Sequence, residues 1–136
     1  MKNRDLYLQQ LIDFKDTSLI KVITGIRRCG KSTLLDLYNE YLLKNGILPT
    51  SIIRMNFESL EFDSIKTYKE LYLYIKERID NSKKLYLLLD EIQQVELWEK
   101  AVNSFLVDFD IDIYISQDQM RICFHLNYLL YCRVDM

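Results

Sequence analysis

One eight-residue segment constrains the fold more than any other part of the sequence. Residues 25–32 read Gly-Ile-Arg-Arg-Cys-Gly-Lys-Ser and match the pattern G-x-x-x-x-G-K-[ST]. A short run rich in β-branched residues at 19–24 precedes the segment, and an amphipathic helical pattern from Thr33 follows it. The segment is therefore predicted to join a strand to a helix, which is the context in which this pattern forms a phosphate-binding loop.

The alternation of strand and helix continues to residue 116. Apolar runs of strand length occupy residues 51–57, 85–89 and 111–116, and a short helix is predicted before residue 16. Strands that alternate with helices imply a parallel sheet with helices on its faces, so we predict an α/β fold. The helical stripes between the strands contain Leu34, Leu37, Tyr38, Tyr41 and Leu42, then Tyr68, Leu71, Tyr72, Ile75 and Ile79, then Trp98, Ala101, Val102 and Phe105.

The composition fits one small folded domain. The chain has 136 residues, of which 49% are hydrophobic and 28% are charged, so it can bury a modest core and does not resemble a disordered chain. No apolar run approaches the roughly 18 to 20 residues of a membrane-spanning helix, and the charged N-terminal segment lacks the apolar stretch of a secretory signal. We expect a cytoplasmic location and no membrane partner.

Charge and metal-ligand content argue against two kinds of site. With 18 basic and 20 acidic residues the net charge is −2, so a nucleic-acid partner is unsupported. Cys29, Cys123 and Cys132 lack the paired spacing of a zinc site, and His125 is the single histidine of the sequence. A transition-metal site built from these side chains is therefore not expected.

The spacing of the phosphate-loop segment suggests a role for its residues. Such a loop turns its backbone N–H groups inward, and the dipole of the following helix adds attraction for a polyphosphate. Lys31 is expected to reach the β and γ phosphates, Ser32 to bind Mg²⁺ and Thr33 to lie near the α-phosphate. The alternative is a plain strand-to-helix turn with an exposed lysine. The predicted nucleotide-binding residues are Gly25, Ile26, Arg27, Arg28, Cys29, Gly30, Lys31, Ser32 and Thr33.

Two adjacent carboxylates, Asp90 and Glu91, end the apolar run at residues 85–89. In phosphate-loop enzymes an aspartate at the end of such a strand serves the Mg²⁺ site, which suggests this role for Asp90. Glu91 is then suited to act as the general base that polarises the attacking water. The alternative, acidic residues that merely open a loop, is weakened by the phosphate-loop segment in the same chain.

Several weaker candidates have ordinary structural explanations beside the functional ones. Asn56, at the end of the second predicted strand, is either a switch that holds Glu91 away from water or a surface amide. Arg27 and Arg28 fit a solvated loop better than a contact to phosphate or to a partner subunit, and Cys29 fits a small loop filler better than a redox sensor. The large aromatic residues of the third helical stripe are predicted to be core rather than a base-stacking surface.

The motifs together resemble the prokaryotic stand-alone AAA-type ATP-binding proteins. The resemblance covers residues 4 to about 116 and rests on GIRRCGKST, on RMNFE at residues 54–58 and on DEIQ at residues 90–93. It implies a P-loop NTPase-like sheet in which the phosphate-loop strand lies between the fourth strand and a fifth. It also implies ATP and Mg²⁺ as ligands, with ATP hydrolysis as the activity of the parent family.

The sequence departs from this family after Ser116. The family continues with Gly-Ser-Asn, whose asparagine senses the γ-phosphate, and later with a Gly-Arg pair, whereas this chain reads QDQMRICFHLNYLLYCRVDM. Back-translation from the third base of the Gln117 codon permits GSNAYMLSSELSTLLSGRY, which restores both features. We hypothesise an out-of-frame tail at residues 117–136 after a partial AAA-type domain at residues 1–116; the alternative is a diverged but genuine tail. A gene whose shifted frame lacks this text would refute the hypothesis.

The departure has consequences for fold and function. A missing last core strand would leave the phosphate-loop strand as a sheet edge, open to self-association or to a protein partner, although the apolar segment 122–132 offers a partial cover. Gln119 stands where the sensing asparagine is expected. We therefore predict Mg²⁺-dependent ATP binding with impaired hydrolysis. The alternatives are a non-enzymatic interaction module with a vestigial nucleotide site and a small-molecule phosphotransferase.

Overall fold

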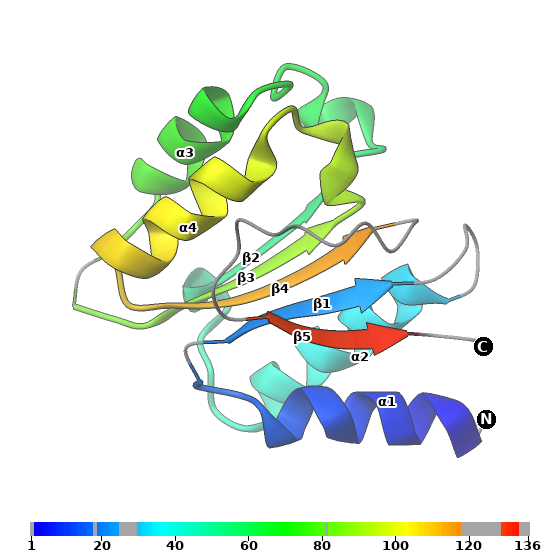
Figure 1. The fold of residues 1–136 in the computed structure, drawn as a ribbon. Helices are drawn as coiled ribbons and strands as arrows, with labels where there is room; N and C mark the ends of the chain where they lie inside the picture. The colour runs from blue at the N-terminus through cyan, green and yellow to red at the C-terminus, as the bar shows by residue number, and fades with distance from the viewer. Residues whose placement is uncertain (1, 18, 25–29, 81, 118–128, 134–136) are drawn as a thin grey trace.

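The computed structural model describes residues 2–17, 19–24, 30–80, 82–117 and 129–133 as one parallel five-stranded sheet with helices on both faces (Figure 1). The strand order is β2-β3-β4-β1-β5, and the neighbouring strands run parallel. The predicted α/β class is confirmed. The strands are β1 (Ile20–Thr24), β2 (Ile52–Asn56), β3 (Leu85–Asp90), β4 (Ile111–Gln117) and β5 (Leu129–Arg133), and the helices are α1 (Lys2–Asp13), α2 (Lys31–Lys44), α3 (Tyr68–Lys76) and α4 (Trp98–Asp108).

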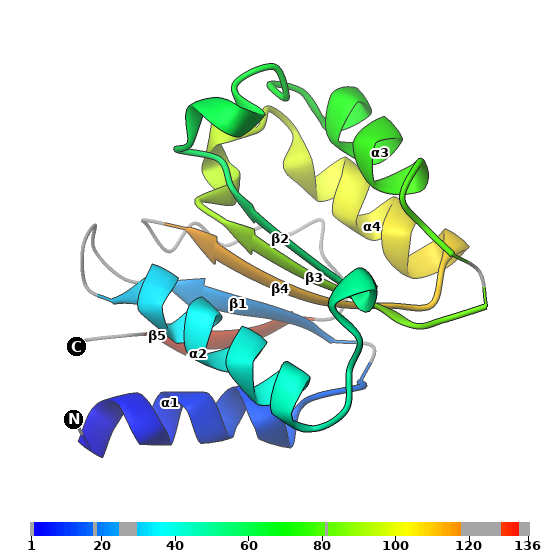
Figure 2. The same ribbon diagram turned by 180° about the vertical axis from the view of Figure 1, so that it is seen from behind.

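The sheet separates two apolar layers. Helices α3 and α4 cover one face and α1 and α2 cover the other, as Figures 1 and 2 show from opposite sides. All six residues of β3 are buried, which agrees with a strand that reads as a continuous apolar run because both its faces are covered. Trp98 and Phe105 pack in the layer between the sheet and α4, so their prediction as core residues is confirmed.

Local signals explain where the helices begin and end. Helix α2 is followed by Asn45 and by Gly46, whose φ of 89° is readily adopted only by a residue without a Cβ. Helix α3 begins with a capping box: Thr67 accepts from the backbone of Glu70, and the Glu70 carboxylate accepts from the backbone of Thr67. These caps satisfy backbone groups that a helix end leaves without partners.

The fifth strand corrects one expectation. The sequence predicted that the last core strand was missing and that β1 formed a sheet edge, but β5 pairs in parallel with β1 from Ile20↔Leu129 to Thr24↔Arg133. The physical reason is that ladder hydrogen bonds come from the backbone, so a short apolar segment of unrelated sequence can complete an open edge. Strand β1 lies between β4 and β5, as the family resemblance implied. The predicted self-association or partner contact required an open β1 edge, and β1 is paired on both sides.

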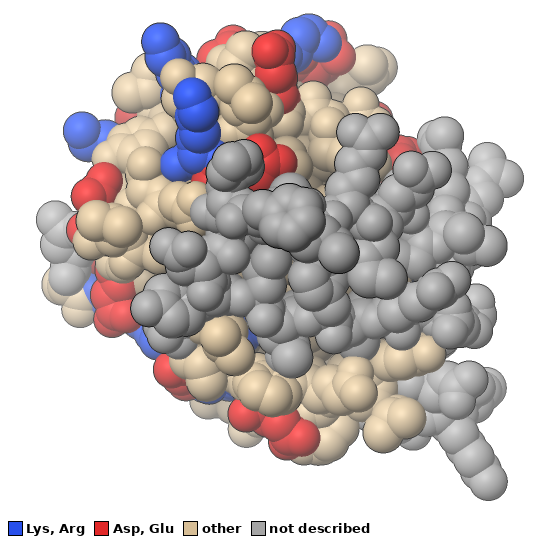
Figure 3. Space-filling view, viewed as in Figure 1, with Lys and Arg blue, Asp and Glu red and all other residues tan. Residues whose placement is uncertain are grey.

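The described part of the face in Figure 3 shows no single-sign charge field. Lys or Arg and Asp or Glu side chains lie interspersed on the described part of the face in Figure 3, in keeping with a net charge of −2. In the described ranges, helices that combine enough length with enough apolar character to cross a membrane are absent.

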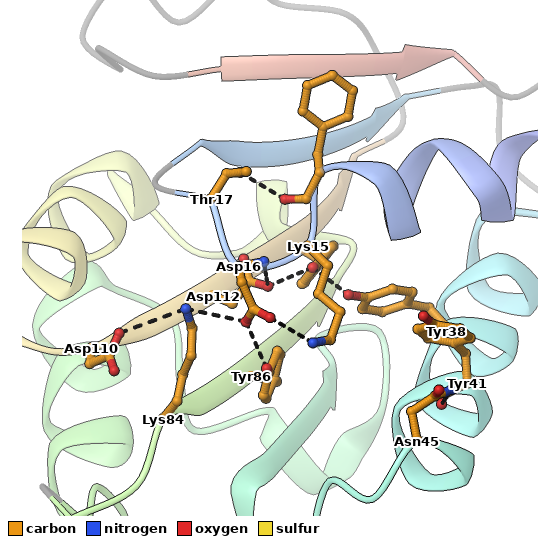
Figure 4. Close-up of polar contacts among 12 residues, drawn as sticks. Lys15, Asp16, Thr17, Tyr38, Tyr41, Asn45, Lys84, Tyr86, Asp110 and Asp112 are labelled. Carbon is orange, nitrogen blue, oxygen red and sulfur yellow. Dashed lines mark hydrogen bonds and ion pairs between the residues drawn. The ribbon is translucent and has the colours of Figure 1, made fainter.

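A polar cluster ties the segment after α1 to the sheet (Figure 4). Asp16, which has a left-handed φ of 63°, donates its backbone N–H to Asp112 on β4 at 2.9 Å. Its carboxylate accepts from the Tyr86 hydroxyl at 2.7 Å and lies 3.2 Å from the Lys84 Nζ. Burial alone would raise the pKa of Asp16, but the hydrogen bonds and charges of Lys15, Tyr86 and Lys84 outweigh it and lower the pKa to about 2.

The lowered pKa of Asp16 predicts a contribution to acid sensitivity. A carboxyl group whose pKa is lower in the folded than in the unfolded state stabilises the fold above its ordinary pKa, and this stabilisation is lost as the pH falls from about 4 towards about 2. Urea unfolding at several pH values is expected to show a smaller acid loss in Asp16→Asn than in the wild type. Asparagine tolerates the left-handed backbone, so the variant isolates the charge. Identical pH profiles would contradict this assignment.

Candidate functional site

The predicted site residues that the structure describes gather where the strands end at their carboxyl edge, beside the first turn of α2. Gly30 precedes the helix with a φ of 103°, a left-handed conformation suited to glycine, and its carbonyl accepts the first helical bond from Leu34 at 2.9 Å. Lys31 opens the helix and is only 3% exposed. Thr33, two residues after Lys31 in α2, is exposed. Five predicted loop residues lie outside the described residues: Gly25, Ile26, Arg27, Arg28 and Cys29.

Asp90 is the centre of the polar contacts at this edge. Its fully buried carboxylate faces α2, because even-numbered residues of β3 lie on that face of the sheet. One oxygen, Oδ2, accepts from the Ser32 hydroxyl and from Arg54 Nη2, the latter at 3.2 Å. The other, Oδ1, accepts from the Ser116 hydroxyl. Three elements besides β3 therefore hold the carboxylate in one orientation.

Glu91 has an unusual backbone conformation beside the same site. Its φ is 58°, a left-handed value that costs a non-glycine residue roughly 1–3 kcal/mol and that is common at functional positions. Its backbone N–H donates to Ser116 Oγ at 2.9 Å. Its carboxylate lies 3.7 Å from the Lys31 Nζ and accepts from Gln93 Nε2 at 2.5 Å. The glutamate is thus turned towards the start of α2 rather than continuing the strand direction.

Asn56 ends β2 directly beside this cluster. It pairs in register with Asp90, so the two residues share the α2 face of the sheet. Its Oδ1 accepts from the backbone N–H of Glu58 at 3.0 Å, and the backbone carbonyl of Asp90 accepts from Phe57. The predicted switch role of Asn56 toward Glu91 is untested by these contacts.

Two contributors were missed in the sequence. Ser116 bridges the Asp90 carboxylate and the Glu91 backbone, and Arg54 contacts Asp90 from β2. Strand periodicity could have indicated both residues. The apolar neighbours of Ser116 and Arg54 in their strands face the α3 and α4 layer, so these two side chains lie on the opposite face, which α2 covers. The predicted γ-phosphate position, Gln119, lies outside the described residues, as does His125.

The donors of this site suit a magnesium–nucleotide ligand. Mg²⁺ prefers oxygen ligands, uses one or two protein groups and keeps several waters, which fits the contact between the Ser32 hydroxyl and the Asp90 carboxylate. A buried ammonium at the start of a helix of 14 residues suits a polyphosphate. The hydroxyl of Thr24, just before the predicted loop, is buried without a hydrogen-bond partner in the described structure. Within those same ranges, His, Cys, Asp and Glu side chains form no group of three or more that would hold a metal.

Comparison with known protein families decides the family. The model of the AAA domain family matches residues 17–121, which include the described strands β1 to β4. The chain belongs to the AAA domain family. AAA domains are ATP-binding domains of ATPases, so the cluster around Asp90 lies in a domain whose family binds nucleotide.

Two further comparisons relate this AAA domain to longer proteins. An uncharacterized protein of Haemophilus influenzae is 49% identical over 117 residues, which are 85% of this chain and 29% of that protein. The AAA domain chain thus spans less than a third of that relative's length. The structure of C. elegans PCH-2 matches 97% of this chain and 40% of its own, with a TM-score of 0.51 and 15% identity. That likeness shows the fold alone.

Proposed function

We propose that this AAA domain binds ATP together with Mg²⁺ at the carboxyl edge of its sheet. The observation that carries the proposal is the contact between Ser32 and Asp90, 58 residues apart in sequence, beside the buried ammonium of Lys31. Lys31 binds the β and γ phosphates, and the oxygens of Ser32 and Asp90 hold the metal. Mg²⁺ held there would supply positive charge against the phosphate oxygens.

In the parent activity Glu91 acts as the general base for ATP hydrolysis. Its carboxylate belongs to the same cluster, and its left-handed backbone turns it toward the helix start. Lys31 is its ion-pair partner, so phosphate that attracts the ammonium competes with Glu91 for the same charge. A Glu91 carboxylate released from this ion pair is placed to accept a proton from the attacking water. Asn56, beside Asp90, is proposed to restrain Glu91 before this change.

The sequence after residue 116 bears on turnover. It lacks the Gly-Ser-Asn and Gly-Arg features of the family, so we propose that hydrolysis is slow while binding is retained. The out-of-frame origin of residues 117–136 stays a hypothesis, which the nucleotide sequence of the gene tests. A frame read from the third base of the Gln117 codon that lacks Gly-Ser-Asn would refute it.

Thermal unfolding of wild type and Glu91→Gln tests the proposal. A ligand that binds only the folded state at about 100 times its dissociation constant stabilises it by about 2.7 kcal/mol, so the melting temperature of both proteins is expected to rise with Mg²⁺ and ATP. Any phosphate release measured in the wild type is expected to stop in Glu91→Gln. No rise in the wild type favours a vestigial site, and loss of the rise in Glu91→Gln alone reassigns this residue to ligand binding.

A further inference from the structure

Arg54 makes a contact that the proposed function does not use. It lies in β2, on the sheet face that α2 covers, and its Nη2 is 3.2 Å from Oδ2 of the fully buried Asp90. Its Nε is 3.2 Å from the carboxylate of Asp36 on α2, and its Nη1 donates to the Met55 carbonyl at 3.4 Å. The guanidinium is therefore fixed at both ends between a strand and a helix.

The oxygen that Arg54 contacts is shared with Ser32. Asp90 Oδ2 accepts from the Ser32 hydroxyl and from Arg54, while Oδ1 is engaged by Ser116. Ser32 and Asp90 are the two groups proposed to hold Mg²⁺. Within the described residues, Arg54 places a positive charge at Oδ2 of this buried carboxylate. An uncompensated buried carboxylate would be strongly destabilising, so the fold has reason to keep this cation there.

We infer that Arg54 is a resident cation that competes with Mg²⁺ for Asp90 and thereby sets the metal concentration at which this domain binds Mg²⁺ with ATP. The inference rests on the proposed function. Two cations that approach the same carboxylate oxygen repel each other, so part of the metal's binding free energy is spent on displacing the guanidinium. Arg54 is a positioning residue, because it acts through Asp90. The exposed Asp36 offers the displaced guanidinium a second carboxylate.

The test is a magnesium titration of nucleotide binding in wild type and Arg54→Met. Methionine keeps an apolar stem and removes the charge. At fixed ATP, Arg54→Met is expected to lower the half-saturating Mg²⁺ concentration about tenfold, which corresponds to about 1.4 kcal/mol. In EDTA its affinity for ATP is expected to equal that of the wild type within about twofold, because Arg54 contacts the carboxylate and not the nucleotide.

Thermal unfolding separates this role from a merely structural one. Without ligand, the melting temperature of Arg54→Met is expected to lie below that of the wild type. This gap in melting temperature is expected to narrow when Mg²⁺ and ATP saturate the site. A structural contact that persisted in the complex would leave the gap unchanged. Arg54→Lys keeps a cation and is expected to restore most of the wild-type magnesium dependence. Arg78→Gln, a surface arginine that donates to the Tyr74 carbonyl, is the matched control and is expected to change neither quantity.

Several outcomes would overturn the inference. An unchanged or higher half-saturating Mg²⁺ concentration in Arg54→Met would show that the guanidinium does not compete with the metal. A tenfold loss of ATP affinity in EDTA would show that Arg54 contacts the nucleotide instead. If Arg54→Met fails to fold, Asp36→Asn removes the second carboxylate available to the displaced guanidinium and is expected to raise the half-saturating Mg²⁺ concentration by a smaller factor. A wild type that binds no ATP with or without Mg²⁺ refutes the proposed function itself.

Discussion

Replacing Lys31 by alanine is expected to weaken ATP binding at least 100-fold, which corresponds to about 2.7 kcal/mol. The ammonium group is almost completely buried at the start of α2, where solvent screens its attraction for phosphate much less than at an exposed position. Lys31 also forms an ion pair with Glu91, so its removal leaves the negative charge of Glu91 facing the phosphates. Equilibrium dialysis with ATP in the presence of Mg²⁺ measures the effect.

The matched control for Lys31→Ala is Lys44→Ala. Lys44 is an exposed lysine at the opposite end of the same helix, so this variant removes the same charge without approaching the proposed site. Its ATP affinity is expected to stay within about twofold of the wild type. An affinity of Lys31→Ala within a few-fold of the wild type would refute the phosphate-loop assignment.

Replacing Lys21 by methionine is expected to destabilise the fold by about 3 to 5 kcal/mol, because it leaves a buried carboxylate without its cation. Lys21 on β1 and Asp112 on β4 form an ion pair in which both side chains are fully buried. Burial lowers the pKa of Lys21 while the charge of Asp112 opposes this shift. Lys21 also donates to the Thr17 carbonyl at 3.2 Å, and Asp112 accepts from the Tyr114 hydroxyl at 2.6 Å. Urea unfolding near neutral pH measures the free energy.

Two variants show whether the ion pair causes this loss. Lys21→Met combined with Asp112→Asn is expected to regain part of the stability, because an amide oxygen still accepts hydrogen bonds without a buried charge. Lys66→Met breaks an ion pair with Asp63 whose side chains are 69% and 65% exposed, and it is expected to cost less than about 1 kcal/mol. A double variant no more stable than Lys21→Met would contradict an electrostatic origin.

The sequence predicted the alternating elements because their periodicity is local. The run at residues 85–89 reads as a strand covered on both faces, and β3 is buried throughout. The proximity of Ser32 and Asp90 could also be predicted, because parallel strands end at one edge of the sheet and α2 begins there. These inferences need no knowledge of which side chains meet across the sheet.

The missed features depend on contacts between elements. Lys21 and Asp112 each interrupt an apolar strand pattern, and their pairing follows only from the β4-β1 neighbourhood. Arg54 is the first residue of the RMNFE motif, but its contact with Asp90 can be predicted only when the register between β2 and β3 is known. Strand β5 was missed because backbone pairing accepts many sequences, so the unusual composition of the tail did not exclude a strand.

Calorimetric titration of the purified chain with ATP, in Mg²⁺ and in EDTA, tests the central claim most directly. The account predicts saturable binding of one ATP per chain that is tighter when Mg²⁺ is present, because Ser32 and Asp90 would hold the metal. Absence of binding at millimolar ATP with Mg²⁺ would contradict it.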